Sequence, residues 1–270
     1  MSRRRPAGRA AALALLGSGL THGALTRWVT HARWQRTNHA GAPVTLVEGP
    51  AYVVGAAIGA AVGDPAGAVA VLGSGAFGAL DDLVGDGSSK GLKGHLGAAA
   101  RGRVTTGFVK VVGIGATGVL AAVLADRDRE DLDAIDTLVG GALVAAAANL
   151  ANLLDLRPGR ALKATLLAGG TILLTSESRG QVSAGAAIGA ALGVLPADLA
   201  GRSMLGDTGA NAAGALIGTA LLESTGRRAR VLALLALTAL TLVSERVSFT
   251  KVIESTPVLR EIDAWGRPPR

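Results

Sequence analysis

Acidic residues at the ends of three apolar segments are the side chains most able to do chemistry in this chain. Asp81 and Asp82 close one segment, Asp155 follows another, and Asp207 opens a third within LGDTG (205–209). A carboxylate beside lipid is costly unless a partner or a function retains it. Three such places suggest one polar site at the membrane surface, and we expect this site to hold a metal ion.

Each acidic motif also has a simpler interpretation. Asp81 and Asp82 would face the negative end of a helix dipole, which favours a bound cation, but they could also form a solvated helix end. Because neighbouring helical residues diverge by about 100°, these two carboxylates should have different roles. Asp207 could bind a ligand at a helix N-terminus or, with Thr208, only cap the helix.

Two Asn residues accompany the second acidic motif. Asn149, Asn152 and Asp155 are spaced by three residues, which predicts that they lie along one helical face. We interpret this face as the lining of a polar pocket. The alternative is that the Asn residues only tie membrane helices together.

A basic, Gly-rich segment follows the first acidic motif. Lys90, Lys93 and His95 lie in KGLKGH (90–95) and could hold phosphate oxygens. A solvated loop is the alternative. The net charge of +7 does not indicate a nucleic-acid partner, because the cations lie in short loops and aromatic residues make up only 3% of the chain.

The composition predicts that a membrane surrounds these residues. Of 270 residues, 49% are hydrophobic and 17% are charged, against about a quarter charged in ordinary soluble domains. The mean hydropathy is +0.42, and the 39 Gly residues suit helices that approach closely in lipid. The absence of Cys excludes disulfides and thiolate chemistry. We predict an integral membrane protein with a single domain over residues 1–270.

Nine apolar segments predict an all-α, polytopic membrane helix bundle with about nine transmembrane helices. Pro65 separates the second segment from the third, because proline disfavours helix in the residue before it. The first segment follows an Arg cluster and resembles a signal peptide, but we expect it to be retained as a span. The segments lie near 10–26, 50–63, 65–80, 105–124, 135–152, 161–176, 182–198, 209–222 and 229–246.

This topology brings the acidic residues to one side of the membrane. With the break at Pro65, the loops that carry Asp81, Asp82, Asp155 and Asp207 share a side, whereas one continuous helix would separate them. Lys and Arg are more numerous in these loops, which predicts that they face the cytoplasm, although the N-terminal Arg cluster argues the other way. We expect a multi-pass protein of the plasma membrane with a cytoplasmic active site and a cytoplasmic tail over 247–270.

A short repeat occurs in two of the segments. Residues 55–63 (GAAIGAAVG) recur almost unchanged at 185–193 (GAAIGAALG). We interpret the repeat as similar composition in Gly/Ala helices rather than as a duplication. Gly-rich faces of this kind also lead us to expect a homodimer formed through helix contacts.

Read in order, the motifs resemble the polyprenyl-phosphate N-acetylhexosamine-1-phosphate transferase superfamily. This family includes the phospho-MurNAc-pentapeptide translocases and the GlcNAc-1-phosphate transferases. The shared elements are the Asp pair that closes a span, N-x-x-N-x-x-D (149–155) that closes another, and GDTG (206–209) that opens a third. RTN (36–38) with G-x-P (41–43) is a partial match, and the resemblance covers about residues 33–222.

Three positions depart from the family pattern. Asp155 is followed by LRPG (156–159) rather than by G-x-D-G, so the second Asp is absent. The Gly-Gly that often precedes the second span reads Glu48-Gly49. The family's last cytoplasmic loop commonly carries a His-rich or basic motif that helps select the sugar nucleotide, but this chain has no His after His95. The identity of the donor is therefore left open.

The resemblance implies Mg²⁺-dependent transfer of a sugar-1-phosphate from a nucleotide-sugar, with UDP as the expected carrier, to polyprenyl phosphate. The polyprenyl-diphospho-sugar would serve cell-envelope glycan synthesis, such as that of peptidoglycan. Mg²⁺ typically uses one or two carboxylates plus substrate phosphates, and Mn²⁺ is the alternative ion. In this interpretation Asp82 and Asp207 bind the metal, and Asp81 orients or deprotonates the lipid phosphate. The substrate-binding residues would be Asn149, Asn152 and Asp155 around the nucleotide, Lys90, Lys93, His95 and Arg202 at phosphates, and Asn38.

Two other functions are alternatives. A non-catalytic homologue that binds a lipid phosphate would explain the altered D-G-x-D-G position and the missing His motif, but it would not need all three acidic motifs, which are present. A small-solute or ion transporter would also use Gly-rich helices and carboxylates within the membrane. The acidic residues, however, cluster at the ends of apolar segments, whereas transporter sites usually lie near the midplane.

Overall fold

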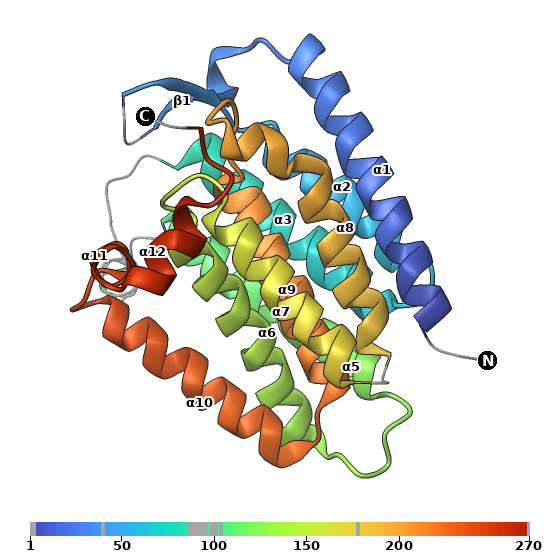
Figure 1. Cartoon of the computed structure of the whole chain (residues 1–270). Helices are drawn as coiled ribbons and strands as arrows, with labels where there is room; N and C mark the ends of the chain where they lie inside the picture. The colour runs from blue at the N-terminus through green and yellow to red at the C-terminus, as the bar shows by residue number, and fades with distance from the viewer. Residues whose placement is uncertain are drawn as a thin grey trace.

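A helix bundle makes up most of the protein (Figure 1). The computed structural model describes residues 4–38, 41–85, 97, 102, 105–176 and 179–268. The long helices are α1 (Arg4–Trp28), α2 (Glu48–Ala60), α3 (Pro65–Val84), α5 (Thr106–Asp126), α6 (Ala134–Leu154), α7 (Arg160–Thr175), α8 (Gly180–Leu199), α9 (Gly206–Ser224) and α10 (Arg227–Ser244). The shorter elements are a 3-10 turn (Ala32–Trp34), the strands β1 (Gln35–Thr37) and β2 (Pro43–Thr45), and the helices α11 (Phe249–Ser255) and α12 (Pro257–Ala264).

Each apolar segment predicted from the sequence overlaps one of the long helices. By length and composition, four of the described helices are able to cross a membrane: α3, α5, α6 and α8. The pair α10 and α11 would add a fifth span if it were counted as one, although its two helices meet at 92°. These helices are compatible with a membrane protein, and spans formed by the other long helices stay a prediction.

The predicted break between the second and third segments is confirmed. α2 ends at Ala60 and α3 begins at Pro65, which suits the first turn of a helix but not its interior. Asp64 caps α3, because its Oδ1 accepts a hydrogen bond from the Gly67 N–H at 2.8 Å. The chain reverses at this point, so the start of α2 and the end of α3 both approach the start of α9.

The bundle has two ends, which differ in the elements they carry (Figure 1). The hairpin end carries β1 and β2, the ends of α1, α3, α6 and α8, and the starts of α2, α5, α7 and α9. The opposite end carries the loops 61–64, 127–133 and 225–226. Asp81, Asp82, Asp155 and Asp207 all belong to the hairpin end, in agreement with the predicted topology.

Helix α9 lies at the centre of the bundle. It packs against α2, α3, α5, α6, α7 and α8, and most of its residues are buried. Its Gly and Ala residues allow this, since an added Cβ at Gly214 or Gly218 would collide with the backbone or Cβ of α6. The polar first turn of α9 is thereby fixed beside the ends of α3 and α6.

The repeated Gly/Ala segments have a packing role. One copy lies in α2 and the other in α8, and both contact α1. An added Cβ at Gly55 or Gly59 would collide with α1, and so would one at Gly185 or Gly189. Two matching grooves that hold one helix therefore account for the repeat.

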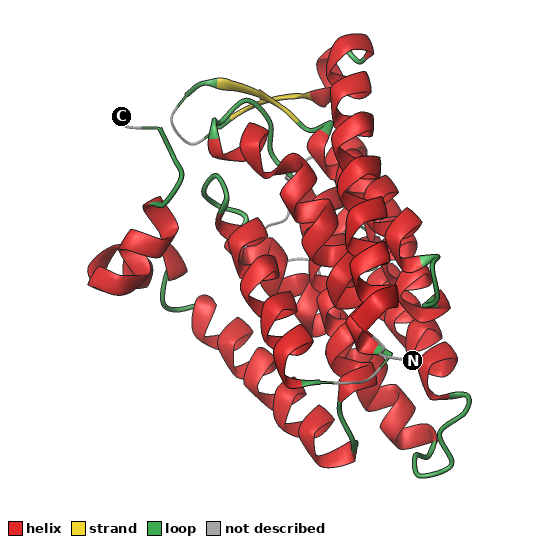
Figure 2. Ribbon diagram, turned by 45° about the vertical axis from the view of Figure 1, so that its right-hand side comes forward, coloured by secondary structure: helices red, strands yellow, loops and turns green. Residues whose placement is uncertain are grey.

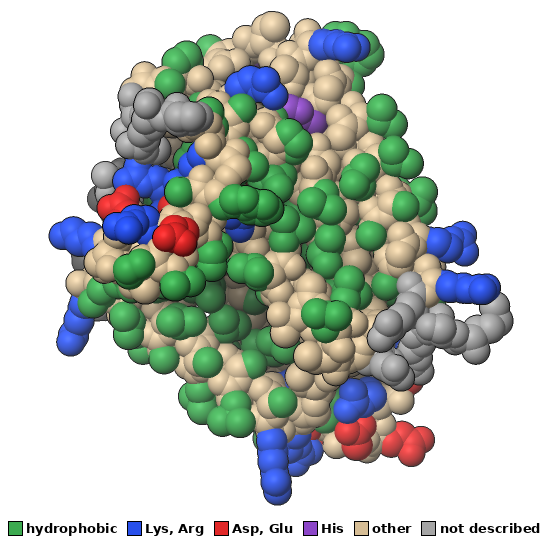
Figure 3. Space-filling model, viewed as in Figure 1, with side chains coloured by type: hydrophobic (Ala, Val, Ile, Leu, Met, Phe, Trp, Pro, Cys, Tyr) green, Lys and Arg blue, Asp and Glu red, His purple; other side chains and the backbone are tan. Residues whose placement is uncertain are grey.

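The outer surface is largely apolar along the length of the helices. Hydrophobic side chains cover much of the face shown in Figure 3, and Lys and Arg gather around its periphery. Leu20 in α1 and Leu232 in α10 are 73% and 66% exposed. A soluble protein seldom exposes a continuous apolar surface of this kind, whereas helices that face lipid require one.

Candidate functional site

A carboxylate from α3 holds the start of α9. Asp82 Oδ1 accepts the Asp207 N–H at 3.1 Å, and Asp82 Oδ2 accepts the N–H and hydroxyl of Thr208 at 2.8 and 2.6 Å. The first N–H groups of a helix have no partner within that helix and carry the positive end of its dipole. Leu205, the residue before α9, provides no side-chain cap. Asp82 thus caps α9 from a neighbouring helix.

Glycines allow the backbones around this cap to touch. An added Cβ at Gly78 in α3 would collide with the backbone of Asp207, and one at Gly49 in α2 would collide with the Leu205 carbonyl. Gly206 has a φ of +59°, a conformation that side chains other than glycine rarely adopt. The turn into α9 is therefore closely fitted between α2 and α3.

One lysine joins the first and third acidic motifs. Lys110 Nζ, from α5, lies 2.7 Å from Asp81 Oδ2 and 2.5 Å from Asp207 Oδ2. The three side chains are only 16–24% exposed, so a partly buried ammonium is shared by two carboxylates. Sequence reasoning missed Lys110. The signal that could have identified it is a single cation inside the apolar run 105–124.

Asp155 brings the second acidic motif to the same region. It follows α6, and the backbone of Gly206 lies beside its carboxyl group. Burial raises the pKa of the Asp155 carboxyl well above its usual range, and the negative charges of Asp198, Asp207 and Asp82 raise it further. The three motifs are therefore close enough to affect one another electrostatically.

Two buried acids that the sequence did not identify as site residues also lie at the hairpin end. Asp198, near the end of α8, accepts the Gly159 N–H at 2.9 Å. Glu48, at the start of α2, is fully buried and accepts the Ser203 hydroxyl at 2.5 Å, while Ser203 Oγ lies 3.3 Å from His22 Nε2. Within the described part of the chain, Glu48 Oε1 has no hydrogen-bond partner. Burial raises the pKa of the Glu48 carboxyl well above its usual range.

The β1–β2 hairpin braces the site. The two strands are antiparallel, with Arg36 opposite Val44, and the Arg36 guanidinium donates a hydrogen bond to the Asp82 carbonyl. β2 also runs beside the segment that leads into α9, where the Met204 N–H donates to the Thr45 carbonyl at 3.0 Å. The segment that partly matched the family pattern therefore lies against the acidic motifs.

The structure does not bring Asn149 to the acidic residues. Asn149 is exposed and its Nδ2 donates to Thr241 Oγ1 of α10 at 3.1 Å, so it joins two helices. The predicted common face is wrong for this residue, because steps of three residues drift by about 60° around a helix with 3.6 residues per turn. Asn152 lies one turn closer to Asp155 and is partly buried.

The other predicted substrate-binding residues have varied positions. Asn38 Oδ1 accepts the Ala42 N–H at 3.0 Å and shapes the hairpin turn. Arg202 is exposed in the loop between α8 and α9, and its carbonyl accepts a hydrogen bond from β2. Lys90, Lys93 and His95 lie outside the described residues.

The metal ion expected at Asp82 and Asp207 stays a prediction. Over the described ranges, no group of three or more His, Cys, Asp or Glu side chains is arranged to hold one. Asp81 and Asp207 share the Lys110 ammonium. Asp82 differs, because its oxygens accept three hydrogen bonds from α9. Its assignment as a metal ligand stays a prediction.

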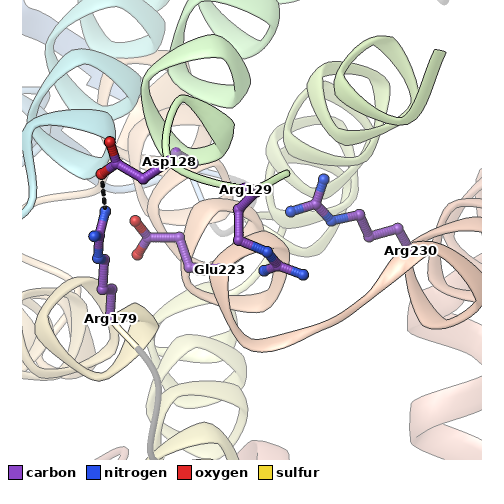
Figure 4. A pocket seen from close by; sticks show the side chains of 6 residues that line it. Asp128, Arg129, Arg179, Glu223 and Arg230 are labelled. Atoms are coloured by element: carbon purple, nitrogen blue, oxygen red, sulfur yellow. Dashed lines mark hydrogen bonds and ion pairs between the residues drawn. The ribbon is translucent and has the colours of Figure 1, made fainter. Parts of the chain in front are cut away.

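The opposite end of the bundle carries charged residues in a different arrangement (Figure 4). Arg230 in α10 is 1% exposed and forms a bidentate pair with Asp126 at 2.7 and 2.8 Å. In Figure 4, the Arg179–Asp128 ion pair lies on one side of Glu223. A cavity of about 130 Å³ is lined by Ala125, Asp128, Arg129, Arg179, Glu223 and Arg230. Paired guanidinium and carboxylate groups dominate this end.

Comparisons with known proteins assign no family to the chain. No family model matches the sequence, and no curated protein matches it at a significant level. The resemblance to the polyprenyl-phosphate sugar-1-phosphate transferases therefore rests on the motifs and their order, and it enters the next section as a proposal.

Proposed function

We propose that this protein transfers a sugar-1-phosphate from a nucleotide-sugar, with UDP as the expected carrier, to polyprenyl phosphate. The reaction would take place at the hairpin end of the bundle, on the cytoplasmic side of the plasma membrane. One observation carries the proposal: Asp81 and Asp207, from two of the motifs, converge on Lys110. Asp82 and Asp155 lie beside this group, so the motifs of the resemblance meet in space.

The proposed reaction joins two anionic phosphates. An oxygen of the lipid phosphate attacks the β-phosphorus of the nucleotide-sugar, the bond between that phosphorus and the bridging oxygen breaks, and nucleoside monophosphate leaves. The products are polyprenyl-diphospho-sugar and the monophosphate. Such a transfer depends on alignment and on neutralisation of negative charge more than on covalent help from the protein.

Different site residues would bind the metal ion, the phosphates and the nucleotide. Asp81 and Asp207 would hold Mg²⁺, or Mn²⁺ in its place, and the ion would supply positive charge to the reacting phosphates. Lys110 keeps these two carboxylates together and offers an ammonium to a phosphate oxygen. Asp82 fixes the first turn of α9. Asp155 would accept hydrogen bonds from the nucleotide.

Product release tests the proposal directly. We expect the purified protein, with undecaprenyl phosphate, Mg²⁺ and a panel of sugar nucleotides, to release nucleoside monophosphate with at least one donor. Mass analysis of the lipid product then identifies the sugar. Asp207→Asn should reduce turnover by on the order of 10²–10³-fold, because it weakens the proposed Mg²⁺ site that supplies positive charge to the reacting phosphates.

A matched control lies at the opposite end. Asp128 is an exposed carboxylate in an ion pair with Arg179, far from the acidic motifs, and Asp128→Asn should leave turnover within about two-fold. Equal turnover in Asp207→Asn and Asp128→Asn would contradict the role of Asp207.

A non-catalytic homologue that binds a lipid phosphate is a second candidate. One observation favours it, namely that Lys110 already lies between Asp81 and Asp207, where a metal ion would bind. This candidate predicts saturable binding of labelled polyprenyl phosphate together with no monophosphate release from any donor in the panel.

A further inference from the structure

The two C-terminal helices leave the bundle sideways. α11 meets α10 at 92°, and α12 begins two residues after α11 ends. Figure 2 shows the pair projecting from the side of the bundle beside one end of α10. Since α10 runs along the bundle, α11 runs roughly along the surface of a membrane that encloses the bundle.

Buried cations from α7 hold α12 in this position. Arg160 is 5% exposed and forms a bidentate pair with Asp263 at 2.7 and 3.1 Å. Lys163 Nζ donates to the carbonyls of Ile262 and Asp263 at 3.1 and 2.6 Å. Although burial opposes it, the hydrogen bonds from Arg160 and Arg267 lower the pKa of the Asp263 carboxyl, so this anchor stays charged. The orientation of α12 is therefore set by the bundle.

One face of α12 and the residue after it is apolar and exposed. Val258, Leu259, Ile262 and Trp265 are 67%, 43%, 42% and 75% exposed. Their spacing places them on one side of the helix, apart from the anchoring Asp263. An apolar face of this kind in water would be unfavourable, because each exposed large side chain forgoes about 1.5–3 kcal/mol of burial free energy.

The end of α10 and the turn that follows it also expose large apolar side chains. Leu240, Leu242 and Val247 are 44%, 60% and 44% exposed and lead from α10 toward α11. Tryptophan prefers the boundary between lipid and water, and short amphipathic helices lie in that boundary with their apolar face toward the acyl chains. A lipid surface therefore suits the face better than a protein partner would.

We propose that α11 and α12 form an interfacial element whose apolar face lies in the headgroup layer of the membrane around the bundle. Val258, Leu259, Ile262 and Trp265 contact the lipid, and Asp263 ties the element to α7. This inference holds whether or not the protein is a sugar-1-phosphate transferase, because it uses none of the acidic motifs.

Fluorescence quenching in vesicles tests the proposal. The chain has three Trp residues, so Trp28→Phe with Trp34→Phe leaves Trp265 as the single reporter in the full-length protein. The vesicles contain phosphatidylethanolamine and phosphatidylglycerol, with bromine on the acyl chains either near the glycerol or near the methyl end. We expect strong quenching by the shallow bromine, weaker quenching by the deep bromine, and little quenching by aqueous iodide.

Two variants of the reporter protein separate lipid contact from other causes. Val258→Glu places a charge on the apolar face and should reduce quenching by the shallow bromine at least about two-fold. Glu261→Gln changes an exposed residue outside that face and should leave the quenching unchanged. Free access of iodide to Trp265 without quenching by bromine would overturn the proposal. Protection from iodide that persists in detergent and increases with protein concentration would also overturn it, because a second copy would then cover the face.

Discussion

Two charged clusters, one at each end of the bundle, are partnered in different ways. At the end that carries the loops 127–133 and 225–226, Arg230 and Asp126 form a buried bidentate pair, like that of Arg160 and Asp263 at the start of α7. At the hairpin end, Lys110 alone serves Asp81 and Asp207, and Asp82 is partnered by the first turn of α9. Asp155 lies beside Gly206 in the same region.

This difference separates charge that stabilises the fold from charge that is available to a ligand. In a bidentate, buried ion pair the two charges neutralise each other, so little charge is left to attract a ligand. Two carboxylates that share one ammonium retain negative charge, which a divalent cation or the proposed substrates could use. Asp64 and Glu223 are an exception at the opposite end, because they are two acidic side chains that lie near each other.

The largest stability effect should come from the opposite end. Arg230→Met keeps the bulk of the side chain but leaves Asp126 buried without its partner, and this should cost about 3–5 kcal/mol of stability. Thermal unfolding in lipid nanodiscs measures the effect. The exposed neighbour is the control, and Arg228→Met should change stability by less than about 0.5 kcal/mol. Equal melting temperatures for the two variants would show that the buried Arg230–Asp126 pair does not stabilise the fold.

Close backbone contact at the hairpin end should give the next largest effect. Gly78→Ala places a Cβ against the backbone of Asp207 and should destabilise the protein by about 1–3 kcal/mol. Gly115→Ala is the matched control, because nothing lies within 4 Å of its added Cβ and Ala favours helix. The two variants should shift the melting temperature in opposite directions. A shift in the same direction would argue against a close-packed turn into α9.

Replacing Lys110 should make the stability of the protein more dependent on metal ions. Lys110→Met leaves Asp81 and Asp207 facing each other without a cation, so the variant should be less stable than the wild type in a chelating buffer. Added Mg²⁺ should then raise its melting temperature by more than it raises that of the wild type. A Mg²⁺ effect that is identical in the two proteins would show that these carboxylates do not bind the ion.

Asp155 should give the smallest effect, which depends on pH. Its pKa is raised in the folded protein, chiefly by burial, so the folded state holds this proton more tightly than the unfolded state does. Its contribution to stability is therefore lost as the pH rises from about 4, where an unfolded Asp titrates, through the folded pKa. Asp155→Asn should be more stable than the wild type at about pH 8 and lose that advantage at about pH 4. Parallel pH profiles for the two proteins would contradict the burial of Asp155.

Much of the bundle could be predicted from the order of apolar and polar residues. Each predicted apolar segment overlaps a helix, because a long apolar run in lipid must satisfy its backbone hydrogen bonds within itself. Pro65 marked the reversal between α2 and α3, since proline is tolerated in the first turn of a helix but not inside it. Because successive helices run in opposite directions, the positions of the reversals were enough to place Asp81, Asp155 and Asp207 at one end of the bundle.

Only the packed structure decided what each polar group touches. Lys110, Asp81 and Asp207 come from three helices, and no local pattern in the sequence records that their side chains meet. The sequence likewise left open whether Asp207 caps its own helix, and Asp82 proved to be the cap. Asn149 turned toward α10, because small drifts around a helix decide which neighbour a side chain reaches. Hydropathy and helix period act along the chain, whereas contacts between helices depend on rotations and close approaches that arise only when the whole bundle packs.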